Sequence, residues 1–309
     1  MNAAQPRFPI PARLNLFLAA LVVTTLVTIF WAAGRVSSGW SLAALALAYG
    51  LIMNTGYALL HEAEHNLFHT NRRLNDGAGV VLALFFPAPF HLIRQGHLGH
   101  HMRNRSDDEA FDFYFEGENP VWKHLQLYGI LTGLFWIVIA LSNVLAALNP
   151  VWLMAKKTSF DRPTAALQES LNPKFLGLIR LEAISIFLLH GTMIYFWKIP
   201  LHHYAAVLFG FGFIWSALQY VHHFGTTRDV QKGARNLKTF TPIDLLWLNH
   251  NWHLNHHLSP TVPWLYLPFL HEGPEFSRGS LVLAYLKMWR GPRFTSECVQ
   301  NRYVGKIIH

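Results

Sequence analysis

Three clusters of histidine carry the most specific chemical information in this sequence. They read HEAEH at 61–65, HLGHH at 97–101 and HLNHH at 253–257. Residues three and four apart share one face of a helix, so each cluster can direct its imidazoles the same way. Imidazole nitrogen binds iron, zinc, copper and nickel well. The candidate metal ligands are therefore His61, His65, His97, His100, His101, His253, His256 and His257.

Eight imidazoles are too many for one ion in tetrahedral or octahedral geometry, so the clusters predict a site for two metals. For any single cluster, the alternative is a solvated helix face that happens to carry histidines. Three such clusters in one chain argue against that alternative.

The elements that position these clusters are expected to be membrane helices. Hydrophobic residues make up 52% of the 309 positions and charged residues only 14%. Stretches of about 20 apolar residues can cross a bilayer as helices. We expect four such spans, at about 14–34, 40–60, 176–198 and 203–221. Two further apolar segments, 79–90 and 126–147, are expected to be interfacial or re-entrant.

These segments predict an all-α integral membrane bundle, a single domain over 1–309 with a cytoplasmic helical cap that carries the histidine clusters. Arg7 and Arg13 precede the first span, while the two short outer connections hold only Arg35 and Lys198. The positive-inside rule then places both termini and all three clusters on the cytoplasmic side. The net charge of +8 is explained by this orientation, so nucleic acid is not an expected partner.

The single cysteine, Cys298, excludes an intramolecular disulfide and an iron–sulfur cluster held by cysteines of this chain. Any redox reaction would therefore need an external electron donor.

The three clusters, in this order and after paired apolar spans, resemble the membrane-bound fatty acid desaturase family and its hydroxylase relatives. The run HHLSPTVPWLYLP at 256–268 is similar to the family's continuation after its third box. The resemblance implies a non-haem diiron centre that uses O2 and two external electrons, with the histidines acting through the two iron ions. It also implies a fatty acyl or other long-chain lipid substrate in the bilayer.

The resemblance further implies a ninth imidazole ligand from the end of the last span. The segment Gln219-Tyr-Val-His222-His223-Phe-Gly is similar to the NYxEHYG run of alkane hydroxylases. In that register His223 is the ligand, with Gln219 in place of an asparagine. Gln219 binding a metal directly or through water, or His222 binding from a rotated helix, are the alternatives.

Carboxylates are expected to hydrogen-bond to metal-bound histidine rings and to set their basicity. The candidates for this role are Glu62, Glu64, Asp107, Asp108, Asp112 and Asp244, although for any single one of them an ordinary solvated loop acid is the favoured alternative.

The leading functional hypothesis is desaturation of a fatty acyl chain, with electrons from a ferredoxin, rubredoxin or cytochrome-type protein. The HxxxH spacing of the first cluster makes the chain look closer to acyl-lipid than to acyl-CoA desaturases. Hydroxylation, ketolation and oxidative decarboxylation of a long hydrocarbon could use the same site and are the enzymatic alternatives. A transition-metal transporter is the non-enzymatic alternative, although transporters place their ligands near the membrane midplane.

Overall fold

The computed structural model describes residues 8–154, 161–271 and 273–297. Arg7, Cys298 and both chain termini lie outside these residues. Twelve α-helices are described, with the following bounds: α1 Ala12–Ala33, α2 Gly39–Glu64, α3 Arg72–Phe85, α4 Phe90–Arg103, α5 Pro120–Leu131, α6 Leu134–Leu148, α7 Arg162–Ser170, α8 Leu176–Trp197, α9 Leu201–Leu218, α10 Thr241–Leu246, α11 His253–Leu258 and α12 Leu281–Met288.

Short 3₁₀ helices and strands complete the described chain. The 3₁₀ helices are η1 Pro150–Met154, η3 Pro173–Phe175, η4 Trp264–Phe269 and η5 Pro274–Phe276. The strands are β1 Phe113–Tyr114, β2 Leu237–Lys238, β3 Gly279–Ser280 and β4 Arg293–Phe294. They form two parallel pairs, β1 with β4 and β2 with β3, which tie the last elements of the chain to earlier ones.

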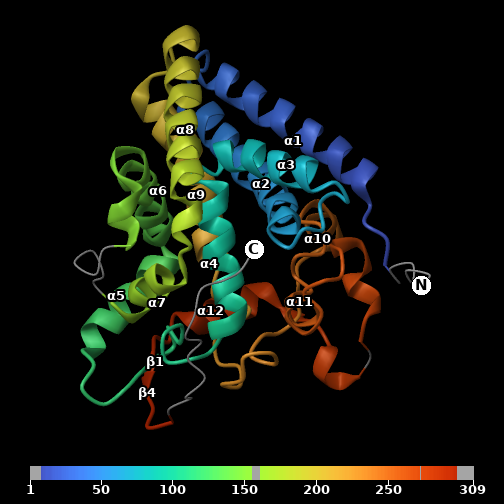
Figure 1. Cartoon of the computed structure of the whole chain (residues 1–309), viewed down its shortest axis with the longest axis vertical. Helices are drawn as coiled ribbons and strands as arrows, with labels where there is room; N and C mark the ends of the chain where they lie inside the picture. Colours follow the sequence, from blue (N-terminus) through green and yellow to red (C-terminus); the bar gives the residue numbers. More distant parts are fainter. Residues whose placement is uncertain (1–7, 155–160, 272, 298–309) are drawn as a thin grey trace.

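Four helices are long and apolar enough to cross a membrane, which confirms the predicted helical membrane bundle. They are Ala12–Ala33, Gly39–Glu64, Pro173–Trp197 and Leu201–Leu218, and each overlaps one of the four segments expected from the sequence. Figure 1 shows them in one half of the molecule, with α10, α11 and α12 gathered in the other half. The first histidine cluster begins in the last turn of α2.

The two apolar segments expected to be interfacial or re-entrant fall on bent helix pairs. The axes of α3 and α4 meet at 100°, and those of α5 and α6 meet at 87°. Pro87 and Pro89 lie at the first break, where they favour the end of α3 over its continuation. Each pair could also count as one broken span, so the interfacial assignment remains a prediction.

The break between α3 and α4 leaves the carbonyls of residues 84–86 without partners inside the helix. Three other helices supply side-chain donors: His190 Nε2 to Leu84 at 2.8 Å, Tyr49 OH to Phe85 at 2.7 Å, and Trp136 Nε1 to Phe86 at 3.2 Å. Non-helical backbone at membrane depth needs partners of this kind because lipid offers none. The direction of α4, which carries the second cluster, is therefore fixed by contacts to the long helices.

The start of α4 is anchored by a carboxylate from α8. Glu182 is buried, and it accepts a hydrogen bond from the backbone N–H of His91 at 3.1 Å. Its other oxygen lies 2.5 Å from His91 Nδ1. A negative charge is favourable at the amino end of a helix, and a buried one needs such partners.

The tightest crossing of two spans, between α2 and α9, depends on glycine. A Cβ at Gly210 would lie 2.2 Å from the carbonyl oxygen of Ala46, and one at Gly50 would lie 2.7 Å from the carbonyl oxygen of Gly210. Small residues let membrane helices approach at their backbones, so this contact fixes the distance between α2 and α9.

We expect Gly210→Ala to destabilise the protein by about 1–3 kcal/mol, because the added methyl group overlaps backbone that cannot move aside. The matched control is Gly191→Ala in α8, where no atom lies within 4 Å of the new Cβ. In a helix interior that change is expected to be neutral or stabilising by up to about 1 kcal/mol. Thermal unfolding in detergent measures both variants. Equal melting temperatures would contradict the close backbone approach.

Candidate metal centre

Nine histidines converge in two neighbouring groups. The first group contains His61, His65, His97, His101 and His256, and the second contains His100, His223, His253 and His257. Within each group, one nitrogen from every ring lies within 4.8 Å of all the others. The two groups are adjacent, because the rings of His101 and His257 are 4.5 Å apart between centroids.

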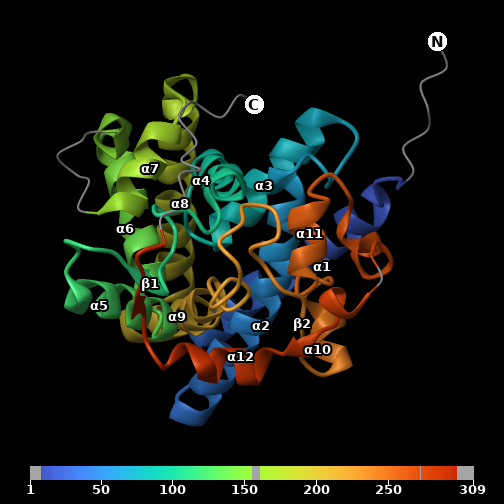
Figure 2. The ribbon, with the colours of Figure 1, turned by 90° about the horizontal axis from the view of Figure 1, so that it is seen from below.

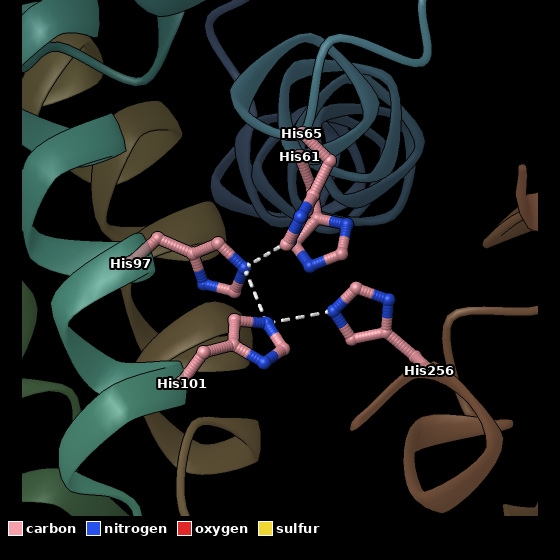
Figure 3. Close-up of side chains that lie close together, drawn as sticks. All are labelled: His61, His65, His97, His101 and His256. Atoms are coloured by element: carbon pink, nitrogen blue, oxygen red, sulfur yellow. Dashed lines mark hydrogen bonds between the residues drawn. The ribbon is translucent and has the colours of Figure 1, made fainter. Parts of the chain in front are cut away.

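Figure 3 shows the first group, with His61 in α2, His65 directly after that helix, His97 and His101 in α4, and His256 in α11. Their Nε2 atoms face the same point. His97 Nε2 lies 2.7 Å from that of His65 and 3.1 Å from that of His101, which lies 2.9 Å from that of His256.

The second group is built the same way. His253 Nε2 lies 3.0 Å from His223 Nε2 and 3.2 Å from His257 Nε2. The ring of His100 lies 4.9 Å from that of His223 and 5.2 Å from that of His257.

The second and third clusters are each divided between the two groups. His97 and His101 are four residues apart on α4 and face the first group, whereas His100 faces the second. On α11, His253 and His257 face the second group and His256 faces the first. Each of these helices therefore contributes to both groups and sets the distance between them.

The donor set fits metal ions better than it fits a hydrogen-bonded cluster. A neutral ring nitrogen carries either a proton or a lone pair, yet His97 Nε2 and His101 Nε2 each face two other ring nitrogens. His61 Nε2 is buried without a hydrogen-bond partner among the described residues. A cation among these atoms would accept every lone pair at once. Nitrogen-rich sites of this kind suit iron, zinc and copper.

Burial keeps these imidazoles in the neutral form that metals require. Desolvation, followed by the positive charge of Arg94, lowers the pKa of His65 to about 3. Desolvation also holds the pKa values of His253, His256 and His257 well below the usual range, and neighbouring histidines lower them further.

A carboxylate missed by the sequence analysis, Glu109, fixes one ligand ring. Its side chain lies 2.7 Å from His100 Nδ1 and accepts a hydrogen bond from Arg103 at 2.9 Å. Burial alone would raise the pKa of Glu109, but these two partners lower it and keep the carboxylate ionised. An ionised acceptor at Nδ1 leaves the His100 Nε2 lone pair free for a metal. The acidic run after the second cluster was the available signal, but it did not single out this residue.

Of the six acidic residues expected near the rings, Glu64 lies beside a ring of the first group. It is fully buried, and one carboxylate oxygen lies 3.9 Å from His97 Nδ1. Several of the others serve the surrounding scaffold. Glu62 accepts from the backbone N–H of Trp264 at 3.1 Å, and Asp107 pairs with Arg228. Asp108 is buried, and Asp112 and Asp244 pair with arginines described below.

His223 is oriented by the loop that follows α9. Its Nδ1 donates to the carbonyl of Gly233 at 2.9 Å, which directs Nε2 towards the second group. Asn104 Nδ2 holds the same carbonyl at 3.3 Å. A Cβ at Gly233 would overlap Arg105, so the close approach requires glycine there.

A buried ion pair fastens this loop to the second cluster. Arg105 donates to Asp112 at 2.6 and 3.1 Å and to the carbonyl of Thr226 at 2.9 Å. Tyr220 OH donates to Asp112 at 2.6 Å, and Gly225 N–H donates to it at 2.7 Å. The end of the last span and the segment after α4 are thereby joined.

The helix of the third cluster, α11, is anchored at its start by a distant asparagine. Asn236 Oδ1 accepts from the backbone N–H groups of Leu254 at 3.0 Å and Asn255 at 3.3 Å. These donors have no partner within the helix, so Asn236 performs the role of an N-cap from another segment. The neighbouring loop is held by Asp244, which accepts from Asn251 at 2.9 Å and from Arg278 at 2.7 Å.

Of the two alternatives to His223, His222 belongs to neither group. His222 is buried with its ring 4.7 Å from that of His253, between centroids. Gln219 Nε2 donates to the carbonyl of Trp215 one helical turn earlier, at 3.2 Å. His250 lies beside the first group, 4.9 Å from the His61 ring. The structure thus brings His223, and not His222, together with the histidines of the second group.

A protein-family model described as Fatty acid desaturase matches residues 38–286, which is most of the chain. No curated protein matches the sequence. The matched segment begins just before α2 and ends within α12, so it contains all nine converging histidines.

We expect Glu109→Gln to weaken metal binding at the second group by roughly 10–100-fold, as is usual when a partner of a ligand ring is lost. The first group should keep its metal. Glu116→Gln, an exposed neighbour, is the control. Competition with a chelator, followed by metal analysis, measures the affinity. Identical chelator sensitivity in the two variants would show that Glu109 does not support His100.

We expect Asp112→Asn to destabilise the protein by roughly 3–5 kcal/mol, because it leaves the fully buried Arg105 guanidinium without its counter-charge. The control is Arg72→Ala, which breaks the exposed Arg72–Asp76 pair and should cost only about 0.3–0.5 kcal/mol. Unfolding in detergent compares the two. A loss for Asp112→Asn no larger than for Arg72→Ala would contradict a structural role for the buried pair.

Proposed function

This chain belongs to the fatty acid desaturase family, and from that premise we propose that it is a membrane-bound, O2-dependent diiron enzyme that introduces a double bond into a fatty acyl chain. Membership of this family implies an oxidoreductase that acts on a lipid within a bilayer, in agreement with the four apolar helices. The nine converging histidines are proposed to hold the two iron ions.

The observation that carries the proposal is the pairing of a five-histidine group with an adjacent four-histidine group. When bound, two irons would supply the oxidising power to remove two hydrogens from neighbouring carbons; O2, those two hydrogens, two external electrons and two protons together give two waters. Side chains alone have no redox group for such a reaction. The donor set is neutral throughout, which distinguishes it from the carboxylate-rich sites of soluble diiron bundles.

The protein's own residues would hold and shield this centre. Four separate segments supply the nine rings, so each ligand is fixed by tertiary contacts and not by a flexible loop alone. A small pocket borders the first group and is lined in part by His61, His256, Glu62, His250 and Trp264. We propose that small reactants reach the metal centre through this pocket.

We further propose that the histidines and both termini face the cytoplasm, where basic residues are expected to concentrate. The electrons would come from a separate ferredoxin, rubredoxin or cytochrome-type protein. In support of an external donor, the chain has one cysteine and so cannot hold a four-cysteine iron–sulfur cluster by itself.

We expect His61→Ala, His100→Ala and His257→Ala each to remove product formation and to lower bound iron, since each deletes one ligand nitrogen from a group. His202→Ala, at an exposed position outside both groups, should do neither. Iron per purified chain and the fatty acids of expressing cells are the measurements. Full product formation by His100→Ala would contradict the proposal that both groups form one two-metal site.

The product distinguishes the reactions that could use this site. Two irons per chain with a new double bond support desaturation. Two irons per chain with a hydroxylated, ketolated or shortened product would support the diiron centre but contradict desaturation as the reaction. Metal movement across vesicles without any oxidised product would favour the transporter alternative.

A further inference from the structure

The helix α12, near the end of the described chain, has an apolar face that no other described element covers. Val282, Leu286 and Trp289 follow the helical repeat, and their exposed fractions are 59%, 56% and 44%. Leu283, beside them, is also exposed. The opposite face, with Leu281, Ala284 and Met288, is buried. A helix that is apolar on both sides needs a second apolar environment.

The buried face of α12 belongs to an apolar cluster that extends to elements at membrane depth. Leu281, Ala284 and Met288 belong to an apolar cluster that also packs against Leu51 of α2 and Ile214 of α9. Both of these residues are inside apolar helices long enough to span a bilayer. Leu51 lies roughly 20 Å along the helix axis before Glu64, at the end of α2.

The same depth is indicated by α10. The carbonyl of Leu246 accepts a hydrogen bond from Thr55 Oγ1 of α2 at 2.7 Å. Thr55 lies roughly 13 Å along the axis before the end of that helix. The elements after α9 therefore reach back along the sides of the spans.

The exposed face continues from α12 onto α5. The rings of Trp289 and Tyr128 stack at 5.7 Å, and Tyr128 OH donates to the Trp289 carbonyl at 3.3 Å. On α5, Val121, Trp122 and Leu125 are exposed. Phe240, just before α10, and Leu245, within it, extend the exposed apolar surface in the other direction. Figure 2 shows α5, α12 and α10 along one side of the molecule.

We propose that α5, α10 and α12 form an in-plane membrane surface, inserted side-on into the leaflet nearest the histidine groups. Lipid, and not another protein, covers this surface, because the surface continues the lipid-facing sides of α2 and α9. Lys287 and Arg290 are exposed on and just after α12, as cations are on helices that lie in an anionic interface. Two exposed tryptophans, Trp122 and Trp289, suit the same boundary.

The insertion links the third histidine cluster to the bilayer. Strand β3 leads directly into α12 and pairs with β2, which closely follows Gly233 and Asn236. Insertion of α12 would hold this segment at a fixed height relative to the spans. This inference depends on the spans and not on the metal or the reaction.

The test uses the full chain with its single cysteine replaced, Cys298→Ser, and with one new cysteine for a nitroxide label. Leu286→Cys reports on the face, and Val282→Cys repeats the measurement if the first variant folds poorly. Leu188→Cys, exposed on span α8, is the lipid reference, and Lys232→Cys is the water reference. The protein is reconstituted in vesicles of phosphatidylcholine and phosphatidylglycerol, and collisions with O2 and with a water-soluble nickel chelate are measured.

We expect the Leu286→Cys label to collide several-fold more with O2 than with the chelate, as the Leu188→Cys label does. Collision rates like those of the Lys232→Cys label would overturn the proposal by placing the face in water. Exclusion of both reagents would also overturn it, because a protein surface, such as a second copy of the chain, would then cover the face.

Discussion

The structure depends on one constraint: nine neutral imidazoles must point their lone pairs at two adjacent positions from four separate parts of the chain. Without a bound cation, such an arrangement is unfavourable, because ring nitrogens about 3 Å apart cannot all be paired. Burial makes protonation costly, so the pKa of His65 falls to about 3 and charge repulsion is avoided. The surrounding contacts must hold the rings in place, and several buried hydrogen bonds do so.

The network works by fixing helices and loops against one another. Donors from three helices satisfy the end of α3, and Glu182 anchors the start of α4, so the second cluster has one orientation. The Arg105–Asp112 pair fastens the loop whose Gly233 carbonyl orients His223. Asn236 fixes the start of α11. Each ligand helix is therefore determined by residues distant from it in sequence.

That pattern explains what the sequence could predict. Continuous apolar runs and the spacing of histidines are local signals, and they identified the four long helices and eight ligand candidates. The choice between His222 and His223 depends on the rotation of the chain after α9, which is set by contacts to residues 104, 105 and 233. Glu109 was missed because only the turn after α4 brings it to His100. The pairing of β1 with β4 joins segments about 180 residues apart and has no local signal.

The distribution of charge around the two groups follows from the same constraint. Neutral ligands leave the full charge of any bound cations uncompensated, so nearby carboxylates would be needed to offset that charge. Glu109 stays ionised beside the second group because His100 and Arg103 both hydrogen-bond to it. Glu64 is fully buried beside the first group, and both of its oxygens lack hydrogen-bond partners among the described residues. A buried carboxylate without a partner is costly unless positive charge lies close by. Arg94 favours the charged form of Glu64 in part, and cations held by the first group would favour it further.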